Sequence, residues 1–337
     1  MYVCGNNCWR ENSWADDRLL SAIWGRMLMS TKSAVYVQVS PHRSSASHSK
    51  TVSVEGFRCI LCGSNHCAEL ILGCRDLYLS KPFVVDYYRC AGCGLVQQHP
   101  VPADVGVFYE AYPVHERKSR IYTRFRRALS LGVYLAPRSL APNSTLLDFG
   151  CGDGWYLEWC RESGVRSLGI EADPAHAARL RDLGLPVYSN IDELTGAHAS
   201  GFDLITLHFV VEHLTDIRGV LSSLRDLLKP GGSIRYVVPN IDSWEFRLFG
   251  RSWHGLDPPR HISFPDARHA RLLAKDLSMI YGGEKPVSFA NGFGGSIPTM
   301  LTGRFRLLPF LATLPLSLFV TWLFPSGNRA YLLTLPA

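Results

Sequence analysis

The feature that most constrains the fold is a short apolar run that carries an acidic residue next to its end and passes directly into a glycine-rich turn. The run is TLLDF at 145–149, and glycines follow it at Gly150, Gly152 and Gly154. A strand that turns through glycines into a helix brings backbone N–H groups and a helix N-terminus close to a ligand, and only glycine allows that approach. The segment 146–155 is therefore predicted to be a ligand-binding loop.

Apolar runs and helical patterns alternate after this loop. Further strands are expected at 167–170, 186–189, 202–207 and 233–238. Helices are expected at 174–183, with Asp173 as N-cap and Pro174 at the first helical position, and at 217–228, where apolar residues recur at three and four spacing. Strands that alternate with helices predict an α/β fold with a doubly wound sheet.

One residue separates this loop from the dinucleotide-binding fingerprint. That fingerprint is Gly-x-Gly-x-x-Gly, and Trp155 stands where its third glycine belongs. A bulky indole at this place argues against a pyrophosphate packed tightly on the loop.

The loop resembles the first motif of class I S-adenosylmethionine-dependent methyltransferases, which is an acidic residue followed by Gly-x-Gly-x-Gly. Asp148, Gly150, Gly152 and Gly154 match it position by position. The resemblance implies a Rossmann-like seven-stranded sheet whose loop holds the methionine part of S-adenosylmethionine. It also implies that an acidic residue at the end of the second strand binds the ribose hydroxyls. Glu171 stands there, and a carboxylate can accept hydrogen bonds from both hydroxyls.

Further segments extend the resemblance over about 145–240. FDLITLHFVVEHL at 202–214 resembles the fourth strand and the loop after it, and LLKPGG at 227–232 resembles the turn before the fifth strand. In the family the end of the third strand supplies residues near the adenine. The corresponding segment here reads SNIDEL, so we expect Asn190 and Ile191 at that place, with Asp192 as the alternative to either.

Two histidines near the end of the fourth expected strand are candidates for the chemistry. Methyl transfer to a hydroxyl is an in-line displacement that also needs a base for the hydroxyl proton. We assign His208 to the cofactor side and Glu212 with His213 to catalysis. The Glu-His pair resembles one at the same point of the ubiquinone-type O-methyltransferases. The alternative is that Glu212 pairs locally while His213 packs against the sheet edge.

The segment SWHGLDPPRHISF at 252–264 is a candidate wall for the methyl acceptor, because it is polar and rich in proline. It resembles the Pro-Arg-His segment of methyltransferases associated with bacterial glycan and polysaccharide biosynthesis. We expect His261 to take part in catalysis. Arg260 either binds an acceptor phosphate or carboxylate or pairs across a loop.

Two Cys-x-x-Cys pairs, each followed by glycine, lie before the glycine loop. Two thiolates on such a knuckle reach one tetrahedral zinc ion, and glycine relieves the strain of the turn. Four thiolates leave no open position, so a structural Zn²⁺ in a zinc ribbon is predicted. The predicted ligands are Cys59, Cys62, Cys90 and Cys93.

The remaining sequence divides the chain into parts. The opening 1–56 is serine-rich and is predicted to be disordered, 57–102 forms the zinc-ribbon module, and 103–140 forms linker or lid helices. The methyltransferase domain is expected at 141–300, and an apolar membrane-associating hairpin with a last strand at 301–337. No signal-peptide pattern is visible at the start, which favours a cytoplasmic protein.

The apolar segment at 307–324 has no charged residue, and Pro309 and Pro315 are expected to interrupt a straight helix. We weigh a spanning helix, a hairpin at the inner membrane surface and a core element of the acceptor region. The NRAYLLTL segment at 328–335 fits the last strand of the sheet.

These features favour methyl transfer to a hydroxyl of a sugar or lipid-linked glycan intermediate, with possible peripheral membrane contact through 307–324. The net charge of +6 also allows an RNA methyltransferase. Nucleic acid is the less favoured partner because no dense Lys/Arg stripe with interleaved aromatics is present. A cofactor-binding protein without turnover is the third reading.

Overall fold

The computed structural model describes residues 54–109, 123, 126–127, 132–197, 201–287, 290–325 and 327–337. All of them belong to one compact unit, Ser49–Ala337. Nearly all of the N-terminal extension that the sequence predicts to be disordered lies outside the described residues. The same holds for much of the predicted lid, including Tyr112 and Tyr122.

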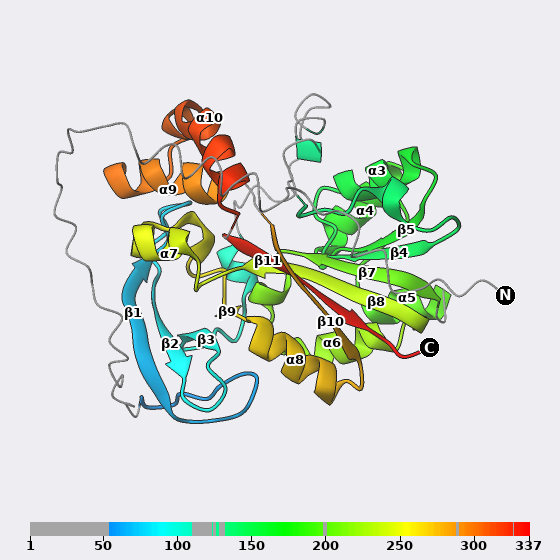
Figure 1. Ribbon diagram of the computed structural model, residues 1–337, viewed down its shortest axis with the longest axis horizontal. Coiled ribbons are helices and arrows are strands. Elements are labelled where there is room, and N and C mark those ends of the chain that lie inside the picture. The colour runs from blue at the N-terminus through cyan, green and yellow to red at the C-terminus, as the bar shows by residue number, and fades with distance from the viewer. Residues whose placement is uncertain are drawn as a thin grey trace, which may run out of the picture. The chain divides into compact units, whose positions relative to one another are not determined.

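A seven-stranded sheet forms the centre of the unit (Figure 1). Its strands are β4 (Thr145–Phe149), β5 (Arg166–Ile170), β6 (Val187–Tyr188), β7 (Phe202–His208), β8 (Leu228–Pro239), β10 (Ile280–Val287) and β11 (Asn328–Thr334). The order is β10-β11-β8-β7-β4-β5-β6. Strands β6, β5, β4, β7 and β8 run parallel, and β11 is antiparallel to both of its neighbours. This confirms the predicted α/β Rossmann-like sheet and the predicted last strand.

Helices cover both faces of the sheet. They are α3 (Trp155–Glu162), α4 (Pro174–Asp182), α5 (Ile191–Ala197), α6 (Ile217–Arg225) and α8 (Ala267–Asp276). Helices α3 and α4 lie on one face, and α6 and α8 on the other (Figure 1). Buried leucines of α6 and α8, Leu221, Leu224 and Leu273, share one core with β7 and β8. Asp173 caps α4 as predicted, because its Oδ1 accepts from Ala175 N at 2.9 Å.

One sequence expectation needs correction in this region. The helix expected at 217–228 ends at Arg225, because Leu228 already belongs to β8. After Asp266 the chain forms α8 and β10, for which no helix or strand is expected from the sequence. Strand β10 is hard to recognise because its residues alternate between exposed and half-buried and it contains two glycines and a proline.

A second, four-stranded sheet carries the cysteine pairs. It consists of β1 (Cys67–Arg75), β2 (Val84–Cys90), β3 (Val96–His99) and β9 (Ser263–Phe264), in that order and with antiparallel pairing. Strand β9 comes from the segment predicted to form the acceptor wall. The cysteine segment is thus joined by backbone hydrogen bonds to that wall.

The rest of the acceptor side is helical. It comprises α7 (Trp244–Phe249), α9 (Asn291–Thr302) and α10 (Leu307–Leu323). Short 3₁₀ turns lie at Gly106–Phe108, Pro137–Ser139, Val211–His213, Gly250–Ser252 and His254–Leu256. Leu307–Leu323 is one helix, and Pro315 lies inside it. Within the described residues, no helix is long and apolar enough to cross a membrane.

Candidate active site

The glycine loop joins β4 to α3 and has the conformation that its sequence predicts. Gly150, Gly152 and Gly154 all have positive φ, at 77°, 54° and 73°. A Cβ on Gly150 would lie 2.6 Å from Val210 Cγ2, and one on Gly154 would lie 2.7 Å from Leu185 Cδ1. The loop therefore requires glycine at these two positions for both backbone conformation and space.

Glu171 lies immediately after β5 and contacts the loop. Its Oε2 accepts a hydrogen bond from Gly152 N at 3.0 Å, and its Oε1 accepts from Asp173 N at 3.2 Å. Each carboxylate oxygen has two acceptor lone pairs, so these backbone bonds orient the side chain without by themselves using up its acceptor capacity. The structure places Glu171 beside the loop, where the ribose role requires it.

Asp148 and His208 form a buried pair under the loop. Asp148 Oδ1 lies 3.1 Å from His208 Nδ1 and accepts from Thr206 Oγ1 at 2.8 Å. Arg235 Nη1 lies 3.4 Å from His208 Nε2, and because a guanidinium only donates, Nε2 is the acceptor and Nδ1 carries the proton. Burial lowers the pKa of His208, which favours this neutral form. The pair ties β4 to β7 beneath the loop.

One cavity of about 980 Å³ connects the loop with the predicted catalytic residues. Its lining includes Gly150 and Gly152 of the loop together with Asp148, Glu171, His208, His213 and His261. The cavity volume falls within the range of small-molecule sites. Asn190 and Ile191 are not part of this lining. Asn190 instead accepts from Glu193 N at 2.8 Å through its Oδ1, at the start of α5.

Residues before the loop, in the segment 103–140 that is predicted to form linker or lid helices, also line the cavity. Arg126 lies over the Trp155 ring, 4.7 Å from its centroid, and forms an ion pair with Asp153 at 3.4 Å. The Tyr134 ring packs edge-on against Trp155, with centroids 4.5 Å apart, and lies tilted against His208, with centroids 4.1 Å apart. The only sequence signal for them is the arginine- and tyrosine-rich composition of the segment 108–138.

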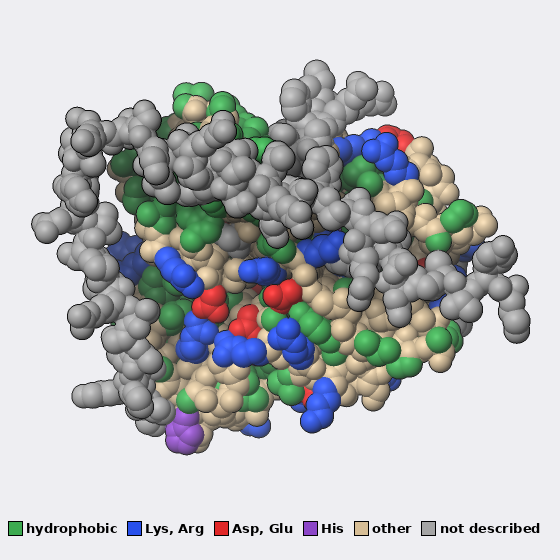
Figure 2. Space-filling view, viewed as in Figure 1, with side chains coloured by type: hydrophobic (Ala, Val, Ile, Leu, Met, Phe, Trp, Pro, Cys, Tyr) green, Lys and Arg blue, Asp and Glu red, His purple; other side chains and the backbone are tan. Residues whose placement is uncertain are grey.

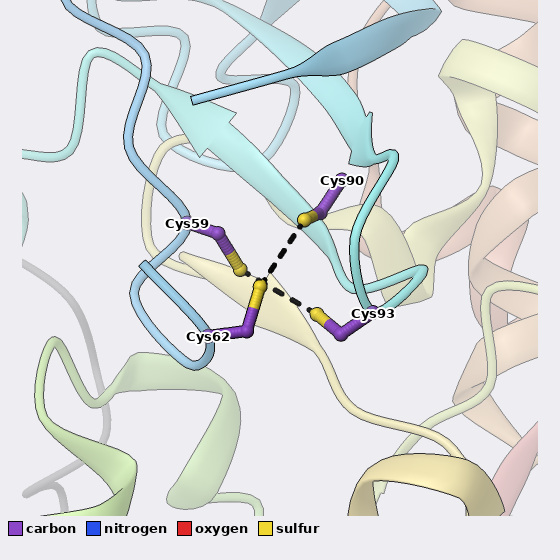
Figure 3. Close-up of side chains that lie close together, drawn as sticks. All are labelled: Cys59, Cys62, Cys90 and Cys93. Carbon is purple, nitrogen blue, oxygen red and sulfur yellow. Dashed lines mark hydrogen bonds between the residues drawn. The ribbon is translucent and has the colours of Figure 1, made fainter. Parts of the chain in front are cut away.

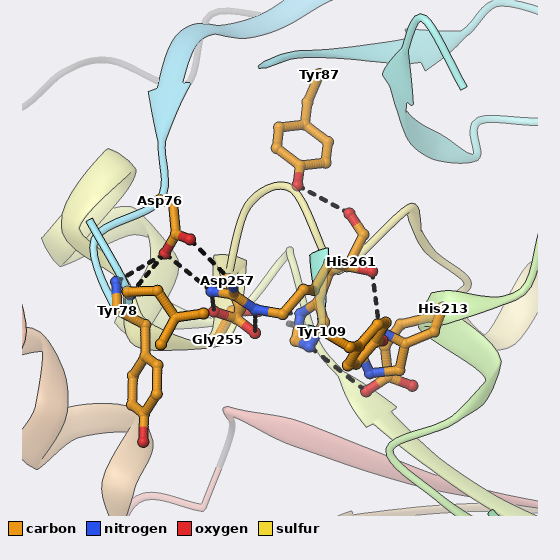
Figure 4. A network of polar contacts seen from close by, with 11 residues as sticks. Asp76, Tyr78, Tyr87, Tyr109, His213, Gly255, Asp257 and His261 are labelled. Carbon is orange, nitrogen blue, oxygen red and sulfur yellow. Dashed lines mark hydrogen bonds and ion pairs between the residues drawn. The ribbon is translucent and has the colours of Figure 1, made fainter. Parts of the chain in front are cut away.

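The predicted catalytic residues meet at the other end of the cavity. The His213 and His261 rings lie 4.8 Å apart, and His261 Nε2 lies 4.0 Å from Glu212 Oε1. Figure 4 shows His213 and His261 together with Tyr109. Glu212 is fully buried and is not part of the cavity lining, so it stands behind the two imidazoles.

Burial sets the protonation states of this cluster. It raises the pKa of Glu212 well above its usual range, and neither carboxyl oxygen has a hydrogen-bond partner among the described residues. Burial, together with the neighbouring His213, lowers the pKa of His261 to about 3. Burial also lowers the pKa of His213, against the effect of the Arg260 carbonyl. These shifts favour the uncharged form of both imidazoles and the protonated form of Glu212.

Hydrogen bonds to backbone carbonyls orient both rings. His213 Nδ1 lies 2.8 Å from Arg260 O, and His261 Nδ1 lies 2.9 Å from Gly255 O. A carbonyl only accepts, so in each neutral ring Nδ1 carries the proton and Nε2 is the basic nitrogen. Tyr109 OH also lies 2.8 Å from His213 Nδ1. The rings are thus held with a defined tautomer.

Arg260 does not serve the acceptor. It is 1% exposed, and it forms ion pairs with Asp257 at 2.6 Å and with Asp76 at 3.0 Å. Burial acts to lower the pKa of Arg260, but the hydrogen bonds and charges of Asp257 and Asp76 outweigh it and raise the pKa. Of the two roles considered for Arg260, pairing across loops is the one observed.

The four predicted zinc ligands converge on one point (Figure 3). The Sγ atoms of Cys59 and Cys93 are 3.6 Å apart, and those of Cys62 and Cys90 are 3.5 Å apart. A tetrahedral zinc with Zn–S bonds of ~2.3 Å sets its sulfurs roughly 3.8 Å apart. The four thiols therefore fit a tetrahedral zinc ion.

The two cysteine knuckles have the same backbone structure. Gly63 N donates to Cys59 O and Gly94 N donates to Cys90 O, each at 2.9 Å. Both glycines have positive φ, at 75° and 83°, as the spacing predicts. The equivalence of the knuckles supports a shared ligand.

Comparison with known proteins adds a family match to this geometry. Residues 120–277 match a family model described as a methyltransferase domain. The ubiquinone biosynthesis O-methyltransferase of Cronobacter sakazakii is 31% identical over 117 residues, which cover 32% of this chain and 48% of that protein. The enzyme of the same name from Hahella chejuensis is 30% identical over 129 residues, covering 36% and 54%. The chain thus spans about half the length of the curated relatives it matches.

Solved structures give a more distant likeness. A S-adenosylmethionine-dependent methyltransferase from Archaeoglobus fulgidus aligns with 68% of this chain and 100% of its own, at 15% identity and a TM-score of 0.41. The assignment of the domain rests instead on the family match, on the glycine loop with Glu171 and on the order of the strands. Residues 120–277 form a methyltransferase domain of the class I, S-adenosylmethionine-dependent type.

Proposed function

We propose that this protein transfers the methyl group of S-adenosylmethionine to a hydroxyl of a sugar or of a lipid-linked glycan intermediate. The observation that carries the proposal is the shared cavity. One end holds the glycine loop and Glu171, and the other holds the neutral imidazoles of His213 and His261. A donor site and a proton acceptor in one enclosure are what hydroxyl methylation requires.

On the donor side, the residues present fit S-adenosylmethionine. Glu171 would accept hydrogen bonds from the ribose hydroxyls, and the loop amides would contact the methionine part. When bound, the cofactor supplies an electrophilic methyl group. The protein's own contribution there is to bind and orient, through the fixed loop and the Asp148–His208 pair beneath it.

On the acceptor side, His213 is the better candidate for the base. A general base works best when its pKa is near the operating pH, and a pKa of about 3 makes His261 a weak base. His213 Nε2 would take the hydroxyl proton, while Nδ1 keeps its proton and donates to Arg260 O. His261 and the protonated Glu212 then act as positioning residues behind it.

A sugar acceptor is supported by the polar groups on that side of the cavity. Glu245, Asn291 and Asn328 line it together with His254 and Trp253. Burial raises the pKa of Glu245, and its Oε2 accepts from Trp253 Nε1 at 3.3 Å. Carboxyl and amide groups in a partly apolar wall suit a ligand with several hydroxyls.

RNA is less well supported as the acceptor. The face shown in Figure 2 mixes Lys and Arg with Asp and Glu, instead of carrying one sign of charge. Nucleic-acid binding relies on dense positive charge against phosphates.

The test combines cofactor binding with label transfer. Calorimetric titration with S-adenosylmethionine should show binding in the wild type. Radiolabelled cofactor added to fractionated bacterial lysate should then label a glycan or lipid-linked glycan fraction. Absence of cofactor binding would refute methyl transfer. Label in RNA would show that RNA, and not a glycan, is the acceptor. Cofactor binding without label in any fraction would favour a cofactor-binding protein that does not transfer the methyl group. His213→Gln should retain cofactor affinity and lose transfer.

A further inference from the structure

Helix α10 has its polar and apolar sides reversed relative to a helix of a water-soluble protein. Ser317 and Thr321 are buried, at 0% and 1% exposed, whereas Leu308, Phe319 and Trp322 are 79%, 58% and 67% exposed. These three large side chains lie on one face, since positions 308, 319 and 322 are separated by near-whole numbers of helical turns. The outward face of α10 is therefore the apolar one.

The buried side of α10 packs on α9 through small residues. Thr313 Oγ1 donates to Gly294 O at 3.0 Å, and Gly294 N donates to Ser317 Oγ at 3.0 Å. A Cβ on Gly294 would lie 3.0 Å from Ser317 Cβ, so the two helices approach closely there. Close contact through Gly, Ser and Thr, with large apolar residues outside, is the pattern of helices that face lipid.

The apolar surface extends beyond one helix. We call it the α9–α10 face. It comprises Met300, Leu301, Leu307, Leu308, Leu311, Leu316, Phe319, Trp322, Leu323 and Phe324, all between 41% and 79% exposed. Figure 2 shows hydrophobic side chains at the top of the molecule, where Figure 1 places α10. A contiguous apolar patch of this kind marks an interaction surface.

Charge indicates what covers this face. Arg304 and Arg306, both exposed, lie in the turn between α9 and α10. No Asp or Glu occurs anywhere from 285 to 337. An apolar face with arginines at its edge and no carboxylate suits an anionic lipid surface, where arginine meets phosphate and Trp and Phe enter the boundary of the acyl chains. If a second copy of this chain covered the face, it would bring the same arginines, and its own residues 285–337 would supply no carboxylate to pair with them.

The length of α10 decides between spanning and lying on the membrane. A helix of 17 residues is about 25 Å long, shorter than the ~30 Å hydrocarbon core of a bilayer. Ser317 and Thr321, on its inner side, bond within the protein. The helix therefore fits a position along the surface with only its outer face in lipid.

We propose that the α9–α10 face docks this protein on an anionic membrane surface. Its place beside the cavity follows from direct contacts. His254 and Gly255 line the cavity, and His254 N donates to Ser296 Oγ of α9 at 2.9 Å. The docked face would thus hold the acceptor end of the cavity near the lipid headgroups. Docking itself does not depend on the proposed methyl transfer.

The test is co-sedimentation of the full chain with vesicles. Wild type should bind vesicles that contain phosphatidylglycerol. The double variant Leu308→Glu/Trp322→Glu should bind at least roughly tenfold more weakly, because two charges replace apolar side chains that enter the lipid in the proposed docked state. Both positions are largely exposed, so the variant should fold. The matched control is Val84→Glu, a 59% exposed apolar residue on β2, which should bind as wild type does.

The arginines provide a second, separate readout. Arg304→Gln/Arg306→Gln should weaken binding to phosphatidylglycerol vesicles by roughly fivefold per arginine and leave residual binding to pure phosphatidylcholine unchanged. Equal binding by wild type and the Leu308/Trp322 variant, or no binding by wild type, would overturn the proposal. Light scattering without vesicles tests the alternative occupant, a second copy of this chain. If wild type does not bind vesicles but self-associates, and the double variant does not self-associate, the face would belong to a second copy.

Discussion

Both Nη atoms of Arg260 contact Asp76, each at 3.0 Å from a different carboxylate oxygen, and both side chains are almost completely buried. Asp76 follows the first strand of the cysteine-bearing sheet, and Arg260 directly precedes His261. In addition, Tyr87 OH on β2 donates to His261 O at 2.8 Å. The cysteine-bearing sheet thus fixes the backbone that presents the cluster of His213 and His261.

This pair should be important for stability. Asp76→Asn removes one of the two carboxylates that pair with the buried Arg260 guanidinium, so the free energy of unfolding should fall by about 3 kcal/mol. Asp242→Asn, which breaks the exposed pair with Arg89 at 3.0 Å, should cost less than about 1 kcal/mol. Urea denaturation of both variants makes the comparison. Equal losses of unfolding free energy in the two variants would show that the buried pair stabilises the fold no more than the exposed pair does.

Removing the zinc ligands should loosen the same region. We expect one zinc per chain, measured by a chromogenic chelator after denaturation, and much less in Cys62→Ser. Cys74→Ser is the control, because Cys74 is buried outside the cluster and should leave zinc content unchanged. A full zinc content in Cys62→Ser would remove this residue from the ligand set.

Glu171 should control cofactor affinity. Glu171→Ala removes the acceptor for the ribose hydroxyls, and because hydrogen bonds to charged groups contribute about 1.5–3 kcal/mol each, calorimetry should show affinity lower by at least roughly tenfold. Asp182→Ala, which removes an exposed carboxylate on α4 that does not line the cavity, serves as control. Unchanged cofactor affinity in Glu171→Ala would exclude Glu171 as the residue that binds the ribose hydroxyls.

Glu212 should make stability fall as the pH rises. Its pKa is raised in the folded state by burial, so its stabilising contribution is complete below the ordinary value of 4.5 and is lost as the pH rises through the folded-state pKa. The loss is at most about 1.4 kcal/mol per pH unit. The side chain of Glu212→Gln cannot titrate. In urea denaturation between pH 5 and pH 8, the free energy of unfolding of this variant should therefore rise relative to that of wild type as the pH increases. A constant difference would mean that Glu212 is ionised in the folded protein.

His261 should have the opposite effect at acid pH. Its folded-state pKa of about 3 lies below the ordinary 6.5, so its contribution is complete above pH 6.5 and is lost as the pH falls towards 3. His261→Gln should therefore lose less stability than wild type between pH 6.5 and pH 4. The exposed His66, changed to Gln, should follow wild type, and identical acid profiles for all three proteins would contradict the buried neutral state.

Local patterns in the sequence predict the first five strands of the sheet, the glycine loop and the cysteine knuckles, because each depends on residues close together in the chain. The partners of Arg260 are different. Asp76 is far away in sequence, and no local pattern marks it as a buried partner. Glu245 and Arg126 likewise reach the cavity only through tertiary packing, and so they are missed. Asn190 and Ile191, placed by resemblance, lie off the cavity lining.

The position of β11 has a consequence for how the chain is made. This strand lies between β8 and β10 and pairs with both, yet among the described strands it is the last to leave the ribosome. Until it emerges, β8 and β10 have unpaired edges and the sheet cannot close. Helices α9 and α10 leave the ribosome before that moment, so their apolar residues can meet lipid or a chaperone while the enzyme is still unfinished. Assembly at the bilayer would then precede completion of the sheet.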